Sequence, residues 1–421
     1  MDGGLLRAVV VCLFAVGAFG VAAAQAEEEP AKKKVRQLTV DRAVKMALER
    51  KSFGEAAEAA VQAEQAGRRT AMAWPNPELN YDREQVWEGG ETAIDDFVFL
   101  EQTLPIWGVR GLRAEAAERQ ARAVKSANDE ARQERTNAVK AAFYRYLRWN
   151  LTFHRVEDWE ERVEALVDTL EKRQKSGEAS ALELQRMRQN LDEARSEAAS
   201  IRAELQSSRG DLAALVGENY EALANDWDVR GDVLPEKVPN LDDLRARLKV
   251  RPDIESLRTQ AEAEELTAAA AARDVIPTPT LRGGYRRVVG GGVSSHGYLA
   301  GVTIPLPALN QNKGERTAAM ARKTRLDALA DLRLNQEKAR LEGDYRAAME
   351  RLDAAREFRK QAIPRAQKLL QRAESRQASG EGSLFGLLEA HRALYEAQVK
   401  AIELDANARQ AVIELESRAG Y

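Results

Sequence analysis

Side chains that could bind a metal or carry catalysis are few and scattered in this chain. None of the three histidines, His154, His296 and His391, has a second ligand three or four residues away that would complete a metal site. No serine, histidine and aspartate pattern suggests an activated nucleophile, and no glycine-rich loop follows a strand to hold phosphate. We therefore predict no enzymatic activity, no cofactor and no bound metal.

Composition and charge indicate long helices rather than a globular enzyme. Charged residues make up 31% of the 421 residues and aromatic residues only 6%, with alanine, glutamate, arginine and leucine throughout. The net charge of −3 gives no overall field that would attract nucleic acid. Nucleic-acid binding is therefore not expected.

The first 26 residues have the pattern of a signal peptide. The apolar run LLRAVVVCLFAVGAFGVAAA ends in AQA, a small-x-small cleavage site, which would leave residues 27–37 as an N-terminal arm. A membrane-anchoring helix is the alternative, because the run reaches the roughly 20 residues needed to span a bilayer. The only cysteine, Cys12, lies in this run, so the exported chain would contain no thiol and no disulfide.

Similar segments about 200 residues apart indicate an internal duplication. WPNP at 74–77 matches IPTP at 276–279, and RQKSGEAS at 173–180 matches RQASGEGS at 376–383, at offsets of 202 and 203. Matches in the same order at nearly constant spacing are typical of a repeated unit. We predict a first repeat, a linker and a second repeat at residues 38–218, 219–243 and 244–421.

Short runs with glycine turns follow each proline pair and predict strands. The expected hairpins cover 78–105 and 280–305, with strands at about 79–87, 95–104, 281–289 and 297–305. One face of the second hairpin would carry Tyr298, Ala300, Val302 and Ile304, and the equivalent face of the first would carry Val98, Leu100, Gln102 and Leu104. Weak alternation is normal for membrane barrels, but a soluble two-hairpin domain explains the same runs equally well.

Apolar residues recur every seven positions in the segments that follow the strands. They are Ala142, Trp149, Val156, Val163 and Leu170, then Leu184, Leu191, Ala198, Leu205 and Leu212. A strict seven-residue period predicts supercoiled partner helices. We expect antiparallel coiled-coil hairpins formed by 113–175 with 180–215, and by 315–378 with 383–418. Pro364 should interrupt and bend the third long helix.

Four strands per chain cannot close a barrel in a membrane. Closure needs at least eight strands, and an open edge in lipid leaves backbone groups without hydrogen bonds. The strand count therefore predicts assembly with further copies of the same chain.

Five segments in order carry a resemblance to a known family. They are LTVDRAVKMALERK, RPDIESLRTQAEAEEL, PTPTLRGGY, GVTIPLPALNQNKGERTAAMAR and ASGEGSLFGLLEAHRALYEAQ. Over about 38–419 the chain resembles the TolC-like outer membrane efflux proteins. VTIPLPALNQNKGE and the proline in QAIPRAQKLLQRAESRQASGEGS are most similar to the heavy-metal branch, the CzcC/CusC-like proteins.

The resemblance implies a mainly α fold with a small membrane β part. In a homotrimer, the long hairpins would form an α-barrel in the periplasm, and four strands per copy would form a 12-stranded β-barrel in the cell outer membrane. The chain would be a passive conduit that works with a periplasmic adaptor (membrane fusion) protein and an inner membrane pump of the resistance-nodulation-division (RND) type. The branch implies heavy-metal cations as cargo.

The resemblance also implies roles for particular residues. Adaptor docking would fall on the two hairpin tips, at Ser176, Gly177, Glu178, Ser379, Gly380 and Glu381. In the matching stretch LFGLLEAH, Glu389 holds one acidic position of a pore constriction but Gly386 occupies the other, so we assign the constriction to Glu389 and Glu183. A solvated helix residue is the alternative for Glu389. The chain would enter and leave the strands at Pro75, Pro77, Pro105, Pro277, Pro279 and Pro305.

A soluble periplasmic coiled-coil adaptor or scaffold is the alternative function. Such a protein would use the same helical hairpins but would keep its strands outside lipid. Two complete copies of the repeat count against it, because an adaptor usually carries a single hairpin.

Overall fold

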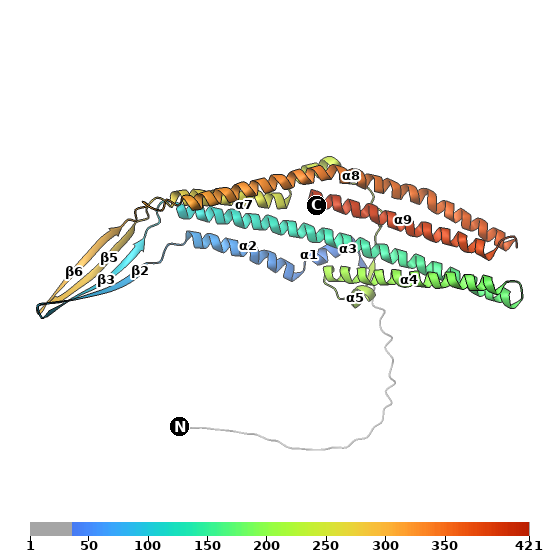
Figure 1. The fold of residues 1–421 in the computed structure, drawn as a ribbon, viewed down its shortest axis with the longest axis horizontal. Coiled ribbons are helices and arrows are strands. Elements are labelled where there is room, and N and C mark those ends of the chain that lie inside the picture. The colour runs from blue at the N-terminus through green and yellow to red at the C-terminus, as the bar shows by residue number, and fades with distance from the viewer. Residues whose placement is uncertain (1–35, 421) are drawn as a thin grey trace, which may run out of the picture.

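The computed structural model describes residues 36–420, so the predicted signal peptide and the predicted arm up to residue 35 lie outside the described residues. The molecule is elongated, with a β-sheet at one end, helices along its length and two helical hairpin tips at the other end (Figure 1). The predicted mainly α fold with a small β part is confirmed.

Helices of both repeats follow the same order. The bounds are α1 (Val40–Leu48), α2 (Lys51–Met72), α3 (Val109–Lys175) and α4 (Ala181–Val216), then α6 (Leu241–Leu248), α7 (Pro252–Arg273), α8 (Lys313–Ala378) and α9 (Leu384–Ala419). At 1.5 Å per residue, the 67 residues of α3 reach about 100 Å. α8 continues through Pro364, which lacks the N–H of one helical hydrogen bond, and the bend expected there stays a prediction.

One antiparallel sheet joins the two β-hairpins. Its strands are β2 (Glu78–Glu88), β3 (Glu91–Thr103), β5 (Thr280–Gly290) and β6 (Val293–Thr303), paired in that order. β3 and β6 begin four residues earlier than predicted, because each turn consists of only two glycines with positive φ, such as Gly89 (+59°) and Gly90 (+87°). The pairing of β3 with β5 ties the first repeat to the second.

The two faces of the sheet differ in chemistry. The register aligns Val98 with Tyr285 and Tyr285 with Tyr298, so the face predicted from the sequence is a real face of the sheet. Its large apolar members are exposed: Leu79, Tyr81, Val98, Leu100, Leu281, Tyr285, Tyr298 and Val302. We call it the apolar face. The opposite, charged face carries two cross-strand ion pairs, Arg282 with Glu101 (3.5 Å) and Arg286 with Asp95 (2.5 Å), and the apolar face carries one, Arg83 with Asp96 (3.8 Å).

The segment between the repeats contains its own structure. It forms α5 (Tyr220–Asn225) and β4 (Trp227–Val229), and β4 pairs in parallel with β1 (Arg36–Leu38). The guanidinium groups of Arg36 and Arg42 lie 4.7 and 4.6 Å from the centre of the Trp227 ring. Strand pairing and cation–π contacts thus hold the start of the described chain against the linker.

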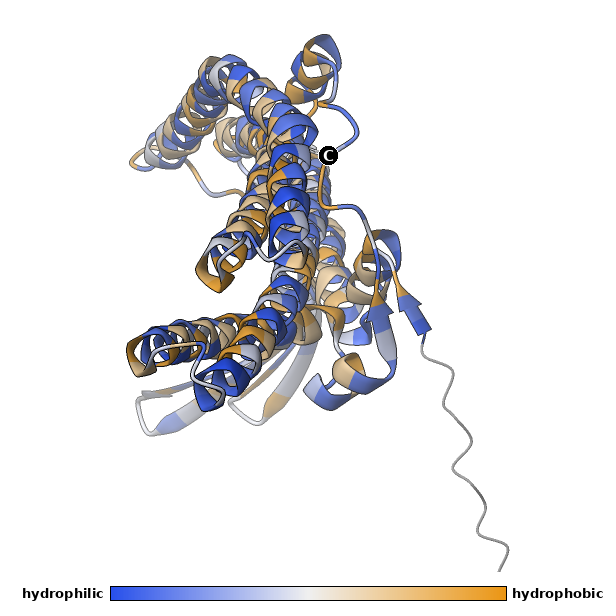
Figure 2. Cartoon of the chain, turned by 90° about the vertical axis from the view of Figure 1, so that its right-hand side faces the viewer, coloured by the Kyte–Doolittle hydropathy of each residue, from blue (hydrophilic) through white to orange (hydrophobic). Residues whose placement is uncertain are grey.

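The predicted seven-residue seam packs the hairpins. Val156, Val163, Leu184, Leu191 and Leu205 are all buried. Viewed from the tips, each long helix alternates between hydrophobic and hydrophilic residues along its length (Figure 2). Within residues 36–420, no helix combines the length and apolar character required to cross a membrane.

Candidate functional site at the helical tips and the sheet

Both hairpin tips reverse the chain with a left-handed glycine. Gly177 has a φ of +80° and Gly380 a φ of +79°, a conformation that favours glycine because a Cβ would be strained there. At the first tip, the N–H of Glu178 donates to Arg173 O (2.8 Å). At the second, the N–H of Glu381 donates to Arg376 O (3.0 Å), which is the same closure of the last helical turn.

Glu183 closes a capping box at the start of α4. Its carboxylate accepts from the Ser180 N–H (2.8 Å), while its own N–H donates to Ser180 Oγ (3.2 Å). The hydrogen bond from the Ser180 backbone lowers the pKa of Glu183 below its usual range. The spacing Ser-x-x-Glu is the sequence pattern of this box, so the sequence contained the signal. The structure thus holds this predicted constriction residue within its own helix.

Glu389 lies on the second turn of α9 and is mostly exposed. Its carboxylate is 3.7 Å from Arg392 on the same helix. At the position equivalent to Glu183, Gly386 donates its N–H to Ser383 Oγ (3.0 Å) and supplies no carboxylate. No contact in the described chain joins Glu183 to Glu389, and the pore constriction remains a prediction.

A polar and aromatic cluster behind the tips was missed by the sequence reasoning. Trp159 of α3 stacks on Tyr395 of α9, with ring centroids 5.7 Å apart, and the Tyr395 hydroxyl donates to Glu197 of α4 (2.7 Å). Burial lowers the pKa of neighbouring His391. Trp159 and Tyr395 are more than 200 positions apart, so periodicity within one helix could not pair them. The cluster connects the first hairpin to the second.

The prolines at the ends of the strands lie where the two repeats meet. Pro75 O accepts from Gln102 Nε2 (3.0 Å), and Pro277 O accepts from Trp107 Nε1 (2.7 Å). Pro279 O accepts from the Leu104 N–H (2.9 Å), which continues the pairing of β3 with β5 beyond the strands. The other predicted prolines, Pro77, Pro105 and Pro305, lie just outside strand ends.

Exposed apolar side chains gather at this junction between sheet and helices. They are Trp74, Ile106, Trp107, Ile276, Ile304, Leu306 and Leu309. Such a concentration of exposed apolar surface is typical of a protein or membrane contact.

Comparison with known proteins gives one family model and several relatives. Residues 43–218 match the model of the outer membrane efflux protein family. The probable outer membrane lipoprotein SilC of Salmonella typhimurium is 26% identical over 229 residues, which cover 51% of this chain and 49% of SilC. The chain thus aligns with about half the length of this curated relative.

Solved structures match the fold over nearly its whole length. The outer membrane protein VceC of Vibrio cholerae is 18% identical, with a TM-score of 0.70 over 90% of this chain and 96% of VceC. CusC is 17% identical, with a TM-score of 0.69 over 94% of this chain and 95% of CusC. At these identities the likeness establishes the fold.

Proposed function

Because residues 43–218 match the model of the outer membrane efflux protein family, we propose that this chain is the outer membrane channel of a tripartite efflux system. In this role it is a passive conduit from the periplasm to the exterior. The strands cross the outer membrane, and the helical part extends through the periplasm.

The two faces and two open edges of the sheet carry the proposal. Eight large apolar side chains of the apolar face are exposed beside one ion pair, Arg83 with Asp96, whereas the opposite face carries the ion pairs of Arg282 and Arg286. β2 and β6 each pair with only one strand of the described chain. Edges cannot remain open in lipid, so the sheet requires neighbours. Three copies supply twelve strands, an even number within the range of bacterial barrels.

The hairpin tips are the proposed docking surface for a periplasmic adaptor, which links the channel to an RND pump. Ser176, Gly177 and Glu178 form one tip, and Ser379, Gly380 and Glu381 form the other. Both lie about 100 Å of helix away from the sheet, at the end of the molecule opposite the membrane part (Figure 1).

Heavy-metal cations are the proposed cargo. The support is the similarity of the segments around residues 302–315 and Pro364 to the CzcC/CusC-like branch, together with the match to SilC. Glu389 is the proposed acidic group of the constriction. Glu183 would contribute to the constriction only if its carboxylate broke its hydrogen bond with Ser180.

Fractionation and gel analysis test the channel role. We expect the mature protein in the outer membrane fraction, as trimers that separate on heating, and we expect a deletion strain to accumulate metal ions. A soluble adaptor would instead be extracted without detergent. A stable water-soluble monomer with an intact sheet would contradict the channel.

Tip variants test docking separately from insertion. Gly177→Val and Gly380→Val should strain the reversals, and we expect weaker adaptor crosslinking with unchanged trimer yield. Normal crosslinking and export by both variants, at normal protein levels, would rule out the tips as the docking surface.

A further inference from the structure

A cavity of about 260 Å³ lies behind the tips, between the two helical hairpins. α3 of the first hairpin lines one side of it, and α8 and α9 of the second hairpin line the rest. His391 of α9 lines this cavity and is half-buried. Because the ordinary pKa of histidine lies near neutral pH, a titratable side chain is placed at the contact between the hairpins.

Charges of opposite sign face His391 from the two hairpins. Arg162 lines the cavity from α3 of the first hairpin, and Glu374 lines it from α8 of the second. Neither of them forms an ion pair with another described residue. The other two charged residues of the lining, Arg155 and Asp158, lie 3.2 Å apart and compensate each other. The uncompensated charges around the ring are therefore one cation on the first hairpin and one anion on the second.

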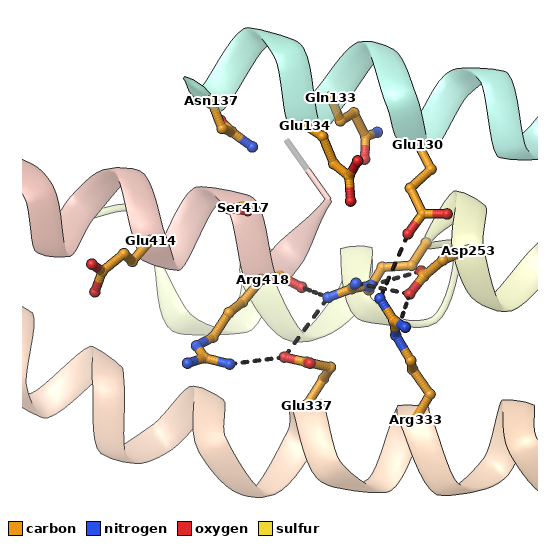
Figure 3. A pocket seen from close by; sticks show the side chains of 11 residues that line it. Glu130, Gln133, Glu134, Asn137, Asp253, Arg333, Glu337, Glu414, Ser417 and Arg418 are labelled. Atoms are coloured by element: carbon orange, nitrogen blue, oxygen red, sulfur yellow. Dashed lines mark hydrogen bonds and ion pairs between the residues drawn. The ribbon is translucent and has the colours of Figure 1, made fainter. Parts of the chain in front are cut away.

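A larger cavity around Asn137, of about 310 Å³, lies farther from the tips and shows the opposite arrangement (Figure 3). No histidine lines it, and all its arginines have acidic partners. The pairs are Arg251 with Asp253 (2.9 Å), Arg333 with Asp253 (2.8 Å) and Arg418 with Glu337 (3.1 Å). Such a network gives no reason for a change near neutral pH.

The remaining contacts around His391 join the hairpins independently of its charge. Tyr395, one turn further along α9, stacks on Trp159 of α3 and donates its hydroxyl to Glu197 of α4 (2.7 Å). Burial and this hydrogen bond raise the pKa of Tyr395, so its hydroxyl stays protonated at neutral pH. His391 is thus the side chain of this cavity that is suited to change its charge near neutral pH.

The packed hairpins favour the neutral form of His391. Burial and the charge of Arg162 lower its pKa, and the charge of Glu374 opposes them only in part. Separated hairpins, in which the ring reaches water, would take up a proton more readily. The contact is therefore most stable above the ordinary histidine pKa of about 6.5 and weakens as the pH falls below that value.

We propose that His391 acts as a pH-sensitive switch at the contact between the two hairpins. Protonation places a positive charge opposite Arg162 of the first hairpin and beside Glu374 of its own hairpin. Both interactions act in the same direction, because α9 is repelled by α3 and attracted by α8. Mildly acidic pH therefore separates the hairpins behind the tips. In the proposed channel this separation would widen the tip end, a consequence that rests on the proposed function, whereas the separation itself does not.

The distance between the two tips tests the switch. The only cysteine, Cys12, lies in the predicted signal peptide, so Glu178→Cys and Glu381→Cys place one spin label on each tip of the full mature protein in detergent. Pulsed electron paramagnetic resonance should give a longer distance at about pH 5.5 than at pH 8, with a midpoint below 6.5. A distance that stayed the same across this range would overturn the proposal.

Variants in the labelled protein assign the effect to His391. His391→Gln, which cannot be protonated, should keep the pH 8 distance in acid. Arg162→Gln changes an exposed residue, so folding should persist, and the acid-induced increase should become smaller because the repulsion is lost. The control is His154→Gln, since His154 is exposed and faces Glu157 of its own helix (3.6 Å), and it should respond as the wild type does.

Two outcomes separate the switch from the channel role. An increase of wild-type size in the His391→Gln variant would assign the pH response to another group and overturn the proposal. Tips that separate in acid in a protein that exports nothing at either pH would support the switch and contradict only the proposed channel.

Discussion

The two helical hairpins have nearly equal lengths and the same turn, yet their seams are built differently. At the offset of 203 that aligns the tips, Trp159 corresponds to Ala362, Val163 to Ala366 and Leu205 to Ala408. The first hairpin is therefore packed by large apolar side chains where the second uses alanine. Small side chains allow close helix approach but remove less apolar surface from water.

A charged pair marks the same contrast. Val156 and Arg202 of the first hairpin correspond to Arg359 and Asp405 of the second. Asp405 is completely buried and lies 2.5 Å from Arg359, which is 42% exposed. The second hairpin thus combines small side chains between its helices with a buried carboxylate.

The contrast predicts which hairpin would depend on neighbouring copies in the proposed assembly. Leu332, Met349 and Leu369 of α8 are exposed, and α8 buries few residues for its 66-residue length. Under the proposed assembly, this surface packs against the next copy. The core of the first hairpin is complete within the described chain, with Leu384, Leu388 and Tyr395 of α9 packed into it, whereas α8 would complete its packing in the trimer.

The largest expected effect comes from removing an aromatic side chain of the first hairpin. Trp159→Ala should lower the free energy of unfolding by about 4 kcal/mol, since a buried ring stacked on Tyr395 is lost. Ala362→Ser, at the equivalent position of the second hairpin, should change it by less than about 0.5 kcal/mol. Denaturant unfolding followed by circular dichroism measures both. Similar losses in the two variants would refute the contrast.

The second tip should tolerate a methyl group less well than the first. A Cβ at Gly382 would lie 2.7 Å from Gln377 N, whereas the equivalent residue of the first tip is already Ala179. Gly382→Ala should destabilise the protein by about 2 kcal/mol because the clash is with backbone. The reverse change, Ala179→Gly, should lower the free energy of unfolding by less than about 1 kcal/mol. Thermal unfolding compares the two, and a neutral Gly382→Ala would show that this tip can shift.

Replacing the buried carboxylate should stabilise the second hairpin at neutral and higher pH. Burial raises the pKa of Asp405 above its unfolded value, so the folded state favours the protonated form and wild-type stability falls as the pH rises through that pKa. Asp405→Asn should raise the free energy of unfolding by about 1 kcal/mol at pH 8. Arg359 would not become a buried unpaired charge, because its side chain keeps access to water.

The gain from Asp405→Asn should disappear as the pH approaches the usual aspartate range near 3.8. Unfolding of both proteins across pH 4–8 measures it. A difference that stayed constant with pH would assign the effect to something other than the charge.

The smallest expected difference lies in the helix caps. Ser180 takes part in a capping box, whereas Ser383 caps α9 without a carboxylate. Ser180→Ala should lower the free energy of unfolding by about 1 kcal/mol, and Ser383→Ala should lower it by less. Gly386→Glu should install the missing box and raise the thermal midpoint slightly. An equal cost for the two serine variants would mean that the box adds nothing to the cap.

Features with a local period were predictable from the sequence. The seven-residue seam, the two reversals and the apolar face through Val98 and Tyr298 all follow from patterns within one segment. Contacts between the repeats could not be predicted from such patterns. Trp159 contacts Tyr395, and β3 pairs with β5, only after the chain has folded back on itself. The cavity around Asn137 likewise combines four helices that no single pattern relates.

The pairing of β1 with β4 constrains the order of folding. Arg36 pairs with Trp227, a separation of 191 residues (227 − 36), so this contact encloses the whole first repeat in one loop. Contacts of such sequence separation form late, because closing a long loop costs entropy before any contact compensates for it. A chain that emerges from its N-terminal end must therefore wait until the first hairpin and α5 have appeared before its leading strand can dock.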